Sequence, residues 1–418
     1  MGEKLRKDGI VIAEKAIQGV LPESGVTRGL KYLEAGGNIY VVSVGKAAWR
    51  MAKAASEEIG ERIRNGIVLT KYDHSMGPIS GFEILEAGHP LPDANSEKGT
   101  LRITEMVSSL ESEDTVLFLL SGGGSALFEK PAPGISLTDI TGITEDLLAC
   151  GADIVEINTV RKRLSSVKAG RFARMVEPAS VYTIVLSDVL GDRLDSIASG
   201  PASADITTAE DAFGILEKYD LQVSGRIRQA LSIETPKELH NVKTVITGSV
   251  RSLCEKAQAV ALSLGYHAAV FATTLDCEAR EAGRFISSLA REEIENRRPL
   301  DLPCALIMGG ETVVHLRGNG KGGRNQETVL SAAIGIRGLE EIVIVSAGSD
   351  GTDGPTDAAG GIVDGASADR MEKRGFSPLE SLERNDSYNA LKASGDLFIT
   401  GPTGTNVNDL IVVLCDRR

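Results

Sequence analysis

Cysteine is scarce in this sequence and follows no binding pattern. The five cysteines among 418 residues are widely spaced and include no Cys-x-x-Cys pair. This argues against a disulfide framework and against a zinc site. We expect reduced, mostly buried thiols, as is typical of a cytoplasmic protein.

Long hydrophobic runs are also missing. No apolar stretch approaches the ~20 residues that span a bilayer, and Glu14 and Lys15 interrupt the apolar N-terminal stretch. That stretch therefore predicts an amphipathic helix rather than a signal peptide. We expect a cytoplasmic protein with no membrane partner.

The sequence also has no excess of basic residues. Lys and Arg number 45 against 58 Asp and Glu, which gives a net charge of −13. A protein that binds nucleic acid independently of sequence needs a basic surface. We therefore expect no nucleic-acid partner.

The overall composition is that of a globular chain, with 42% apolar and 25% charged residues. The length predicts two domains or three. Glycine is in excess, with 46 residues and no repeat period, so we place the excess in turns and loops.

The arrangement of apolar runs predicts the fold. Runs rich in Val, Ile and Leu end in turns bearing Gly or Asp, and helical patterns follow them, as in parallel sheets covered by helices on both faces. We expect two α/β domains with mostly parallel, Rossmann-like sheets, an N-terminal one at 1–238 and a C-terminal one at 239–418, although one domain could borrow a segment from the other. The expected strands lie at 39–44, 115–120, 181–187, 244–247 (opening the second domain), 304–308, 313–316, 342–347 and 410–415.

The loops after these strands hold the candidate site residues, because ligands bind beyond the carboxyl ends of parallel strands. Lys46 opens a helix, where a cation opposes the helix dipole unless an anion joins it; a solvated surface lysine is the alternative. Three successive glycines after the strand at 115–120 predict backbone N–H groups that converge on an anion, or a purely structural turn. That loop comprises Ser121, Gly122, Gly123, Gly124 and Ser125.

Two further segments of the first half carry charged side chains. If residues 158–168 are helical, four polar side chains share one face, which is either solvated or turned toward an anion. Asp188 directly follows a strand, with Asp192 soon after; such carboxylates bind Mg²⁺ or act as a general base, or they cap the next helix. The four polar residues are Asn158, Arg161, Ser165 and Lys168.

The second half holds the densest group of polar loops. Glu311 follows a strand, and a run with four glycines in six positions, 318–323, leads to Arg324 and Asn325 at a helix start. So much glycine is costly in conformational entropy unless the backbone approaches something closely. A cation at a helix start is explained if Arg324 contacts a phosphoryl group.

Other polar residues leave alternatives open. Asp350 and Asp353 follow the strand at 342–347 without the spacing of a calcium loop, so Mg²⁺ binding and helix capping both remain. Thr405 and Asn406 lie in a polar loop expected to contact a ligand. His89, framed by prolines, is the one histidine kept as a possible site member. G-x-S-x-G and G-x-G-x-x-G are both absent, which argues against a Ser-His-Asp hydrolase and against a dinucleotide fingerprint.

Taken together, these segments resemble the glycerate 2-kinase family. The resemblance runs through nearly the whole chain and rests on strings such as VGKAAWRMA, LSGGGSALFEKPAPGISLTD, GGRNQE and DGTDGPTDAAG. It implies ATP-dependent phosphorylation of D-glycerate, a magnesium requirement, an active site in a cleft between two α/β domains, and Lys46 and Arg324 as central active-site cations. Ser349 stands where we expect Thr, and Ala169 where we expect Gly, which leaves the fine geometry open.

The residues and the resemblance agree on phosphoryl transfer, which needs positioning and charge stabilisation. We predict that the glycine loop, Asn158, Arg161, Glu311, Asn325, Thr405 and Asn406 bind substrate or nucleotide. We predict that Lys46 and Arg324 stabilise charge on the transferred group. Asp188, aided by Asp192, Asp350 or Asp353, would hold Mg²⁺ or orient the attacking hydroxyl. A nicotinamide-dependent hydroxypyruvate reductase and a non-catalytic nucleotide or sugar-acid sensor remain the alternatives.

Overall fold

The computed structural model describes residues 2–416, and the chain divides into two compact units. The first unit is Gly25–Thr247, and the second combines the segment up to Ser24 with the segment from Gly248 onward. Each unit contains one six-stranded sheet covered by helices, which confirms the expected α/β fold with two domains. Among the described residues, no helix has the length and apolar character needed to cross a bilayer.

The sheet of the first unit has the strand order β3-β2-β1-β4-β5-β6. β1 pairs in parallel with β2 and β4, β2 with β3, and β4 with β5, so these five strands end at the same edge. The chain moves outward from β1 through β2 and β3, then returns to the other side of β1 as β4. Open parallel sheets bind ligands at such a reversal point. The strands are β1 (Ile39–Val44), β2 (Ile63–Lys71), β3 (Phe82–Ala87), β4 (Thr115–Leu120), β5 (Ser180–Leu186) and β6 (Val242–Gly248).

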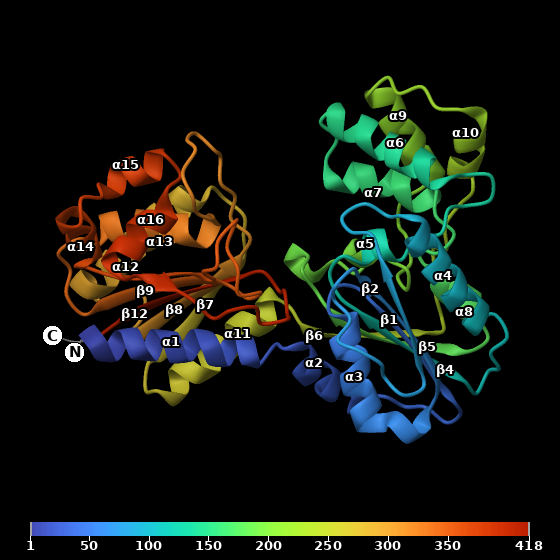
Figure 1. Ribbon diagram of the computed structural model, residues 1–418, viewed down its shortest axis with the longest axis horizontal. Coiled ribbons are helices and arrows are strands. Elements are labelled where there is room, and N and C mark those ends of the chain that lie inside the picture. Colours follow the sequence, from blue (N-terminus) through green and yellow to red (C-terminus); the bar gives the residue numbers. More distant parts are fainter. Residues whose placement is uncertain (1, 417–418) are drawn as a thin grey trace. The chain divides into compact units, whose positions relative to one another are not determined.

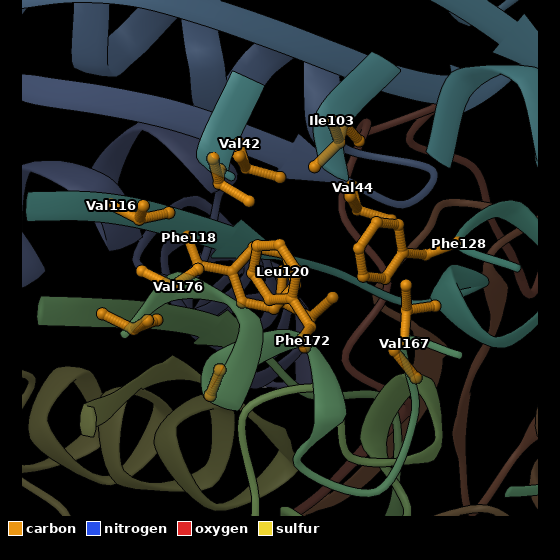
Figure 2. Packing of buried hydrophobic residues seen from close by; sticks show 14 of the residues in the cluster. Val42, Val44, Ile103, Val116, Phe118, Leu120, Phe128, Val167, Phe172 and Val176 are labelled. Atoms are coloured by element: carbon orange, nitrogen blue, oxygen red, sulfur yellow. The ribbon is translucent and has the colours of Figure 1, made fainter. Parts of the chain in front are cut away.

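Three phenylalanines form the centre of the core on one face of this sheet. The rings of Phe118, Phe128 and Phe172 pack with centroids 4.9 to 5.9 Å apart, and Val42 and Val116 lie around them (Figure 2). All six residues of β4 are buried, because helices cover both faces of the strand. Burial on both faces is why this strand is a continuous apolar run in the sequence.

Several helices of the first unit begin at a side-chain cap. Asp93, Ser136, Asp153 and Thr208 each form a capping box, an arrangement worth about 1 kcal/mol per helix. Helices α6, α7, α9 and α10 share a separate apolar core, which we call the helical lobe. The helices are α2 (Pro22–Leu30), α3 (Ala48–Ile59), α4 (Ala94–Val107), α5 (Gly124–Leu127), α6 (Leu137–Ala149), α7 (Ile154–Arg163), α8 (Arg171–Val176), α9 (Ala209–Lys218) and α10 (Gly225–Leu231), with short 3-10 turns at Gly60–Arg62, Leu190–Asp192 and Ile197–Ser199.

The sheet of the second unit is mixed, so the expectation of a mostly parallel sheet is wrong here. Its order is β11-β10-β9-β12-β8-β7; β7 and β8 are parallel, whereas β12 runs antiparallel to both β8 and β9, and β10 antiparallel to β9 and β11. A fully buried apolar strand has the same sequence pattern in either direction, so the pattern predicted β8, β9 and β12 but not their orientation, and it did not predict β7, β10 and β11. The expected strand at 313–316 forms only an isolated bridge. The strands are β7 (His267–Leu275), β8 (Cys304–Gly310), β9 (Ile342–Gly348), β10 (Gly360–Asp364), β11 (Leu397–Phe398) and β12 (Asp409–Cys415).

Helices cover both faces of the second sheet. α1 and α11 lie on one face, and α12 and α13 lie on the other (Figure 1). The helices are α1 (Gly2–Gln18), α11 (Val250–Ser263), α12 (Ala279–Asn296), α13 (Arg324–Gly335), α14 (Ser367–Lys373), α15 (Pro378–Glu383) and α16 (Ser387–Ser394).

The units differ from the expected ranges 1–238 and 239–418 in two places. The N-terminal helix α1 packs in the second unit, where Tyr266 donates a hydrogen bond of 2.6 Å to Asp8 and Arg6 pairs with Asp364. The segment at 244–247 belongs to β6, the last strand of the first sheet, and does not open the second. An amphipathic helix and an apolar strand carry no local sign of which sheet they join, so only the folded chain assigns them.

Candidate functional site

Two loops meet at the reversal point of the first sheet. Lys46, after β1, donates its backbone N–H to the carbonyl of Gly122, after β4, at 2.8 Å. The next N–H, of Ala47, donates to Ser121 Oγ at 3.1 Å. The loop bearing the predicted cation and the predicted anion-binding glycine loop are therefore in direct contact.

The glycines of the second loop allow other side chains to approach its backbone. A Cβ on Gly122 would collide with the carboxylate of Asp188. Gly123 has a φ of +86°, and a Cβ there would lie 3.0 Å from His89 Cδ2 and 3.2 Å from Lys46 Cγ. Asp188, His89 and Lys46 thus gather around this loop, as expected for members of one site. α5 begins at Gly124, so the first N–H groups of this short helix are not used within it.

The charge around His89 is positive. Lys46 is half-buried, and its ammonium has no hydrogen-bond or ion-pair partner among residues 2–416. Burial, and then the charges of Lys46, Lys71 and His74, lower the pKa of His89 to about 4. His89 is therefore neutral at pH 7, and the local cations favour an anionic ligand.

Asn158 and Arg161 reach the same glycine loop through Ser199. Arg161 Nη2 donates to Asn158 Oδ1 at 2.8 Å and to Ser199 Oγ at 3.2 Å, and Ser199 Oγ lies 3.0 Å from Ser125 Oγ. Burial lowers the pKa of Arg161, against the opposing influence of the Glu129 charge. The sequence-based grouping of Asn158, Arg161 and Ser125 is thus reproduced in space.

Lys168 and Glu129 form a buried ion pair that sequence reasoning missed. α7 ends at Arg163, so Ser165 and Lys168 do not continue its face as expected. Lys168 Nζ contacts Glu129 Oε2 and donates to Ser125 O at 2.7 Å, and both side chains are almost fully buried. Burial lowers the pKa of Lys168 to about 8, although the Glu129 charge acts in the opposite direction. Nothing local in the sequence marks these two charges as partners.

The backbone around this network is strained. Ala169, Ala198 and Ser199 have φ values of 53°, 50° and 62°, in the left-handed region that costs a residue with a Cβ roughly 1–2 kcal/mol. Ala169 donates its N–H to the Ser199 carbonyl at 3.1 Å, which joins the strained segments. Ala169 is the position where the resemblance leads us to expect glycine, so this departure adds strain next to Lys168. Strain of this kind concentrates at functional sites.

A pocket opens between the glycine loop and the helical lobe. It is lined by residues 89–92, by residues of α5, α6 and α7, and by the buried ion pair of Glu129 and Lys168. Its polar lining residues include His89, Ser125, Glu129, Thr144, Arg161 and Lys168.

Asp188 and Asp192 differ in their surroundings. Asp188 lies against Gly122 and is partly exposed. Asp192 has a φ of 54°, and its buried Oδ1 has no hydrogen-bond partner among residues 2–416. Across residues 2–416, no group of three or more His, Cys, Asp or Glu side chains has the arrangement of a metal site.

In the second unit, Arg324 stands at the start of α13 as predicted, but two carboxylates already pair with it. Arg324 Nε and Nη2 donate to the two oxygens of Asp409 at 2.6 and 3.1 Å, and Nη1 donates to Glu311 Oε1 at 2.9 Å. Burial tends to lower the pKa of Arg324, but the charge and hydrogen bonds of Asp409 and the charges of Glu311 and Asp353 together outweigh it, so the pKa is raised. Burial raises the pKa of Asp409 to about 6, against the influence of Arg324.

Sequence reasoning did not select Asp409 as a site residue, because it stands at the first position of a strand, β12. β12 runs antiparallel to β8 and β9, and Asp409 therefore pairs with Gly310 and Gly348, the last residues of those strands. Only a mixed sheet brings the first residue of one strand to the ends of its neighbours.

Asp353 caps α13. Its carboxylate accepts hydrogen bonds of 2.9 to 3.3 Å from the backbone and side-chain amides of Asn325 and Gln326, and burial raises its pKa. Asn325 Oδ1 in turn accepts a bond of 2.6 Å from Ser346. The polar atoms of Asn325 and Asp353 are thus used inside the protein, which favours capping over metal binding for Asp353.

The remaining predicted site residues lie in loops of the second unit. Thr405 is buried, and its hydroxyl donates to the Val20 carbonyl at 3.1 Å. Asn406 is partly exposed and accepts a bond of 3.2 Å from the N–H of Asn408. Asp350 is partly exposed and bonds within its own loop. Asn406 and Asp350 keep surface for a ligand, whereas the Thr405 hydroxyl has an internal structural partner.

Comparison with known proteins covers the whole chain. Residues 10–232 match a family described as a domain of unknown function, DUF4147, and residues 304–409 match the MOFRL family. The D-glycerate 2-kinase of Thermotoga maritima is 57% identical over 412 residues, with 99% of each chain covered. The glycerate 2-kinase of Pyrococcus horikoshii is 40% identical over 436 residues, with 99% of this chain and 98% of the relative covered.

Two further matches bear on the alternatives. A putative hydroxypyruvate reductase of Agrobacterium vitis is 41% identical over 385 residues, with 90% of this chain and 87% of the relative covered. The crystal structure of a glycerate kinase from Thermotoga maritima matches with a TM-score of 0.96 at 57% identity, covering 99% of this chain and 100% of that one.

Proposed function

Because the chain belongs to the glycerate 2-kinase family, we propose that it transfers the terminal phosphoryl group of ATP to the 2-hydroxyl of D-glycerate. The products are 2-phosphoglycerate and ADP. The observation that carries this function is the 57% identity with a D-glycerate 2-kinase over 99% of both chains. The positively charged pocket of the first unit, beside the glycine loop, agrees with an anionic substrate.

Lys46 and Arg324 are the proposed catalytic cations. Phosphoryl transfer spreads negative charge over the oxygens of the transferred group, and fixed cations stabilise that charge. Lys46 supports this role because its ammonium has no partner among residues 2–416. Arg324 supports it because Asp409 and Glu311 hold its guanidinium plane in one orientation while 32% of its side chain stays exposed.

Mg²⁺ is the proposed cofactor, and two residues of the first unit fit it. Asp188 is partly exposed, and its carboxylate lies against Gly122, where a Cβ would collide with it. Asp192 has a buried oxygen without a hydrogen-bond partner among residues 2–416. Mg²⁺ binds carboxylate oxygens, and one or two protein ligands suffice where phosphates and water complete the site. We propose Asp188 and Asp192 as its ligands, with Asp350 as a further candidate. When bound, the ion neutralises charge on the ATP phosphates.

Asp188 has a second proposed role as the group that orients the attacking hydroxyl. A carboxylate next to the acceptor accepts the hydrogen bond of the 2-hydroxyl and points its oxygen lone pair at the phosphorus. Asp188 lies against the glycine loop and is partly exposed, which supports contact with a substrate.

The decisive experiment is a coupled assay. Purified protein is incubated with ATP, Mg²⁺ and D-glycerate, and enolase is added without a mutase. Formation of phosphoenolpyruvate is expected, because enolase acts on 2-phosphoglycerate. A signal that requires phosphoglycerate mutase would overturn the 2-hydroxyl assignment. Consumption of NADH with hydroxypyruvate, in the absence of ATP, would favour the reductase named among the relatives, and thermal stabilisation by glycerate without turnover would favour a sensor.

Two other expectations remain proposals. We propose a cytoplasmic location, supported by five free cysteines, which suit a reducing compartment; cell fractionation tests it. The expectation of an active site in a cleft between the two domains also stays a prediction.

A further inference from the structure

The pocket of the first unit holds two polar atoms that the protein itself leaves unpaired. Within the described part of the chain, the buried Oε1 of Glu129 accepts no hydrogen bond and the buried Nε–H of Arg161 donates none. Both residues line the pocket. A buried polar group without a partner is destabilising, and a ligand that supplies the partner recovers that loss.

The charge of the pocket indicates a ligand with one negative charge. Arg161 and Lys168 are cationic, Glu129 is anionic, and His89 is neutral at pH 7 because its pKa lies at about 4. One positive charge is therefore left over. A single carboxylate compensates it and gives the Nε–H of Arg161 an acceptor.

The unpaired Glu129 oxygen needs a different partner, a hydrogen-bond donor. Lys168 contacts the other oxygen, Oε2. A hydroxyl group is the donor that a small sugar acid offers, and a hydrogen bond from a hydroxyl to a carboxylate is among the strong ones. The pocket is thus complementary to a small molecule that carries both a carboxylate and a hydroxyl.

The location of the pocket decides which hydroxyl that is. Gly123 and Ser125 of the glycine loop form part of its wall, so a ligand in the pocket lies next to the loop predicted to bind phosphate. A hydroxyl that donates a hydrogen bond to Glu129 is held at the pocket wall, so it is not free to accept the phosphoryl group.

We propose that this pocket binds the acceptor, with Arg161 and Lys168 holding the glycerate carboxylate and Glu129 accepting a hydrogen bond from the 3-hydroxyl. This inference rests on the proposed function. In this arrangement Glu129 is the specificity-determining residue. Glu129 requires a 3-hydroxyl on the acceptor and leaves the 2-hydroxyl for phosphorylation.

D-Lactate tests the proposal, because it is D-glycerate without the 3-hydroxyl. The value of kcat/KM is measured for both acids with ATP and Mg²⁺ by ADP release. Wild-type protein is expected to prefer D-glycerate by roughly 10- to 100-fold, the range for one hydrogen bond to a charged group. In Glu129→Gln this preference is expected to fall at least fivefold, because the acceptor no longer carries charge.

The ratio of the two substrates separates recognition from structural damage. A merely structural role would lower kcat/KM for both acids equally and leave the ratio unchanged. Glu293→Gln is the matched control, since Glu293 is also fully buried with an unpartnered oxygen but lies on α12, away from this pocket. It is expected to keep the wild-type ratio.

Each outcome is informative. Equal kcat/KM for the two acids in wild-type protein overturns the role of Glu129, as does an unchanged ratio in Glu129→Gln, while the kinase function stands. If Glu129→Gln does not fold, the wild-type comparison still decides. No ADP release with D-glycerate would overturn the proposed function instead; calorimetric binding of D-glycerate against D-lactate then tests the pocket alone, and equal affinities overturn it.

Discussion

Arg324 and Asp409, 85 residues apart in the chain, form a two-pronged ion pair with N–O distances of 2.6 and 3.1 Å. The Asp409 side chain is only 5% exposed, whereas that of Arg324 is 32% exposed. A planar guanidinium held at two nitrogens has a fixed orientation. The protein therefore supplies a cation at the start of α13 together with the carboxylate that aims it.

We predict that Arg324→Ala lowers kcat by roughly a hundredfold or more, since a cation on the transferred phosphoryl group is worth about 10³–10⁵ in rate. The assay is enolase-coupled turnover, with thermal unfolding followed by circular dichroism to confirm that the variant folds. Arg284→Ala is the control, because Arg284 is an exposed residue of the same unit that pairs with Glu281 within its helix. Near-normal turnover of folded Arg324→Ala would contradict the catalytic role.

Asp409 leads to a prediction about pH. Burial raises its pKa to about 6, so below that pH Asp409 binds a proton and Arg324 keeps only Glu311 as an ionic partner. We expect kcat/KM for D-glycerate to decrease as the pH falls through about 6, because kcat/KM reports groups of the free enzyme. Asp409→Asn, which resembles the protonated form, is expected to be less active at neutral pH and to lack this acidic decrease. The same decrease in Asp409→Asn would assign it to another group.

For Lys46 we predict a loss of activity without a loss of stability. Its ammonium has no partner among residues 2–416, so Lys46→Met is expected to change the free energy of unfolding by about 0.5 kcal/mol or less. Its kcat is expected to fall roughly a hundredfold or more. Lys53→Met is the control, since Lys53 lies on α3 and forms an exposed pair with Glu57. Loss of both stability and activity in Lys46→Met would indicate a structural role.

Substitution of Asp353 is predicted to lower stability, whereas substitution of Asp188 is predicted to raise the Mg²⁺ requirement. Asp353 accepts bonds from the first amides of α13, so Asp353→Ala is expected to reduce the free energy of unfolding by about 1–3 kcal/mol. Its Mg²⁺ requirement should stay unchanged. Asp188→Asn is expected to raise the Mg²⁺ concentration for half-maximal activity roughly tenfold or more, as losses around a metal do. Denaturant unfolding measures the change in stability, and Mg²⁺ titration of turnover measures the metal requirement. A shifted Mg²⁺ requirement in Asp353→Ala would indicate that Asp353 is a Mg²⁺ ligand.

Part of the site was predictable because it depends on short-range patterns. Glycine or a charged residue directly after a buried strand is a local signal of a ligand loop, so Lys46, Gly122 and Asp188 were identified, and they lie together. Asn325 and Thr405 were chosen for polarity in similar loops, yet their polar side-chain atoms bond to the protein interior. The type of a residue and its position in a loop do not determine whether its side chain points to the ligand or to the protein interior.

The sequence by itself determined seven of the twelve strands in the described part of the chain, together with the glycine loops, because apolar runs and backbone freedom are properties of a few neighbouring residues. Only the tertiary structure decided that α1 packs with the second sheet, that β12 runs antiparallel, and that Glu129 meets Lys168 and Asp409 meets Arg324. Those pairings join residues 39 and 85 positions apart. Their free energy comes from burial and charge that exist only once the distant segments have packed.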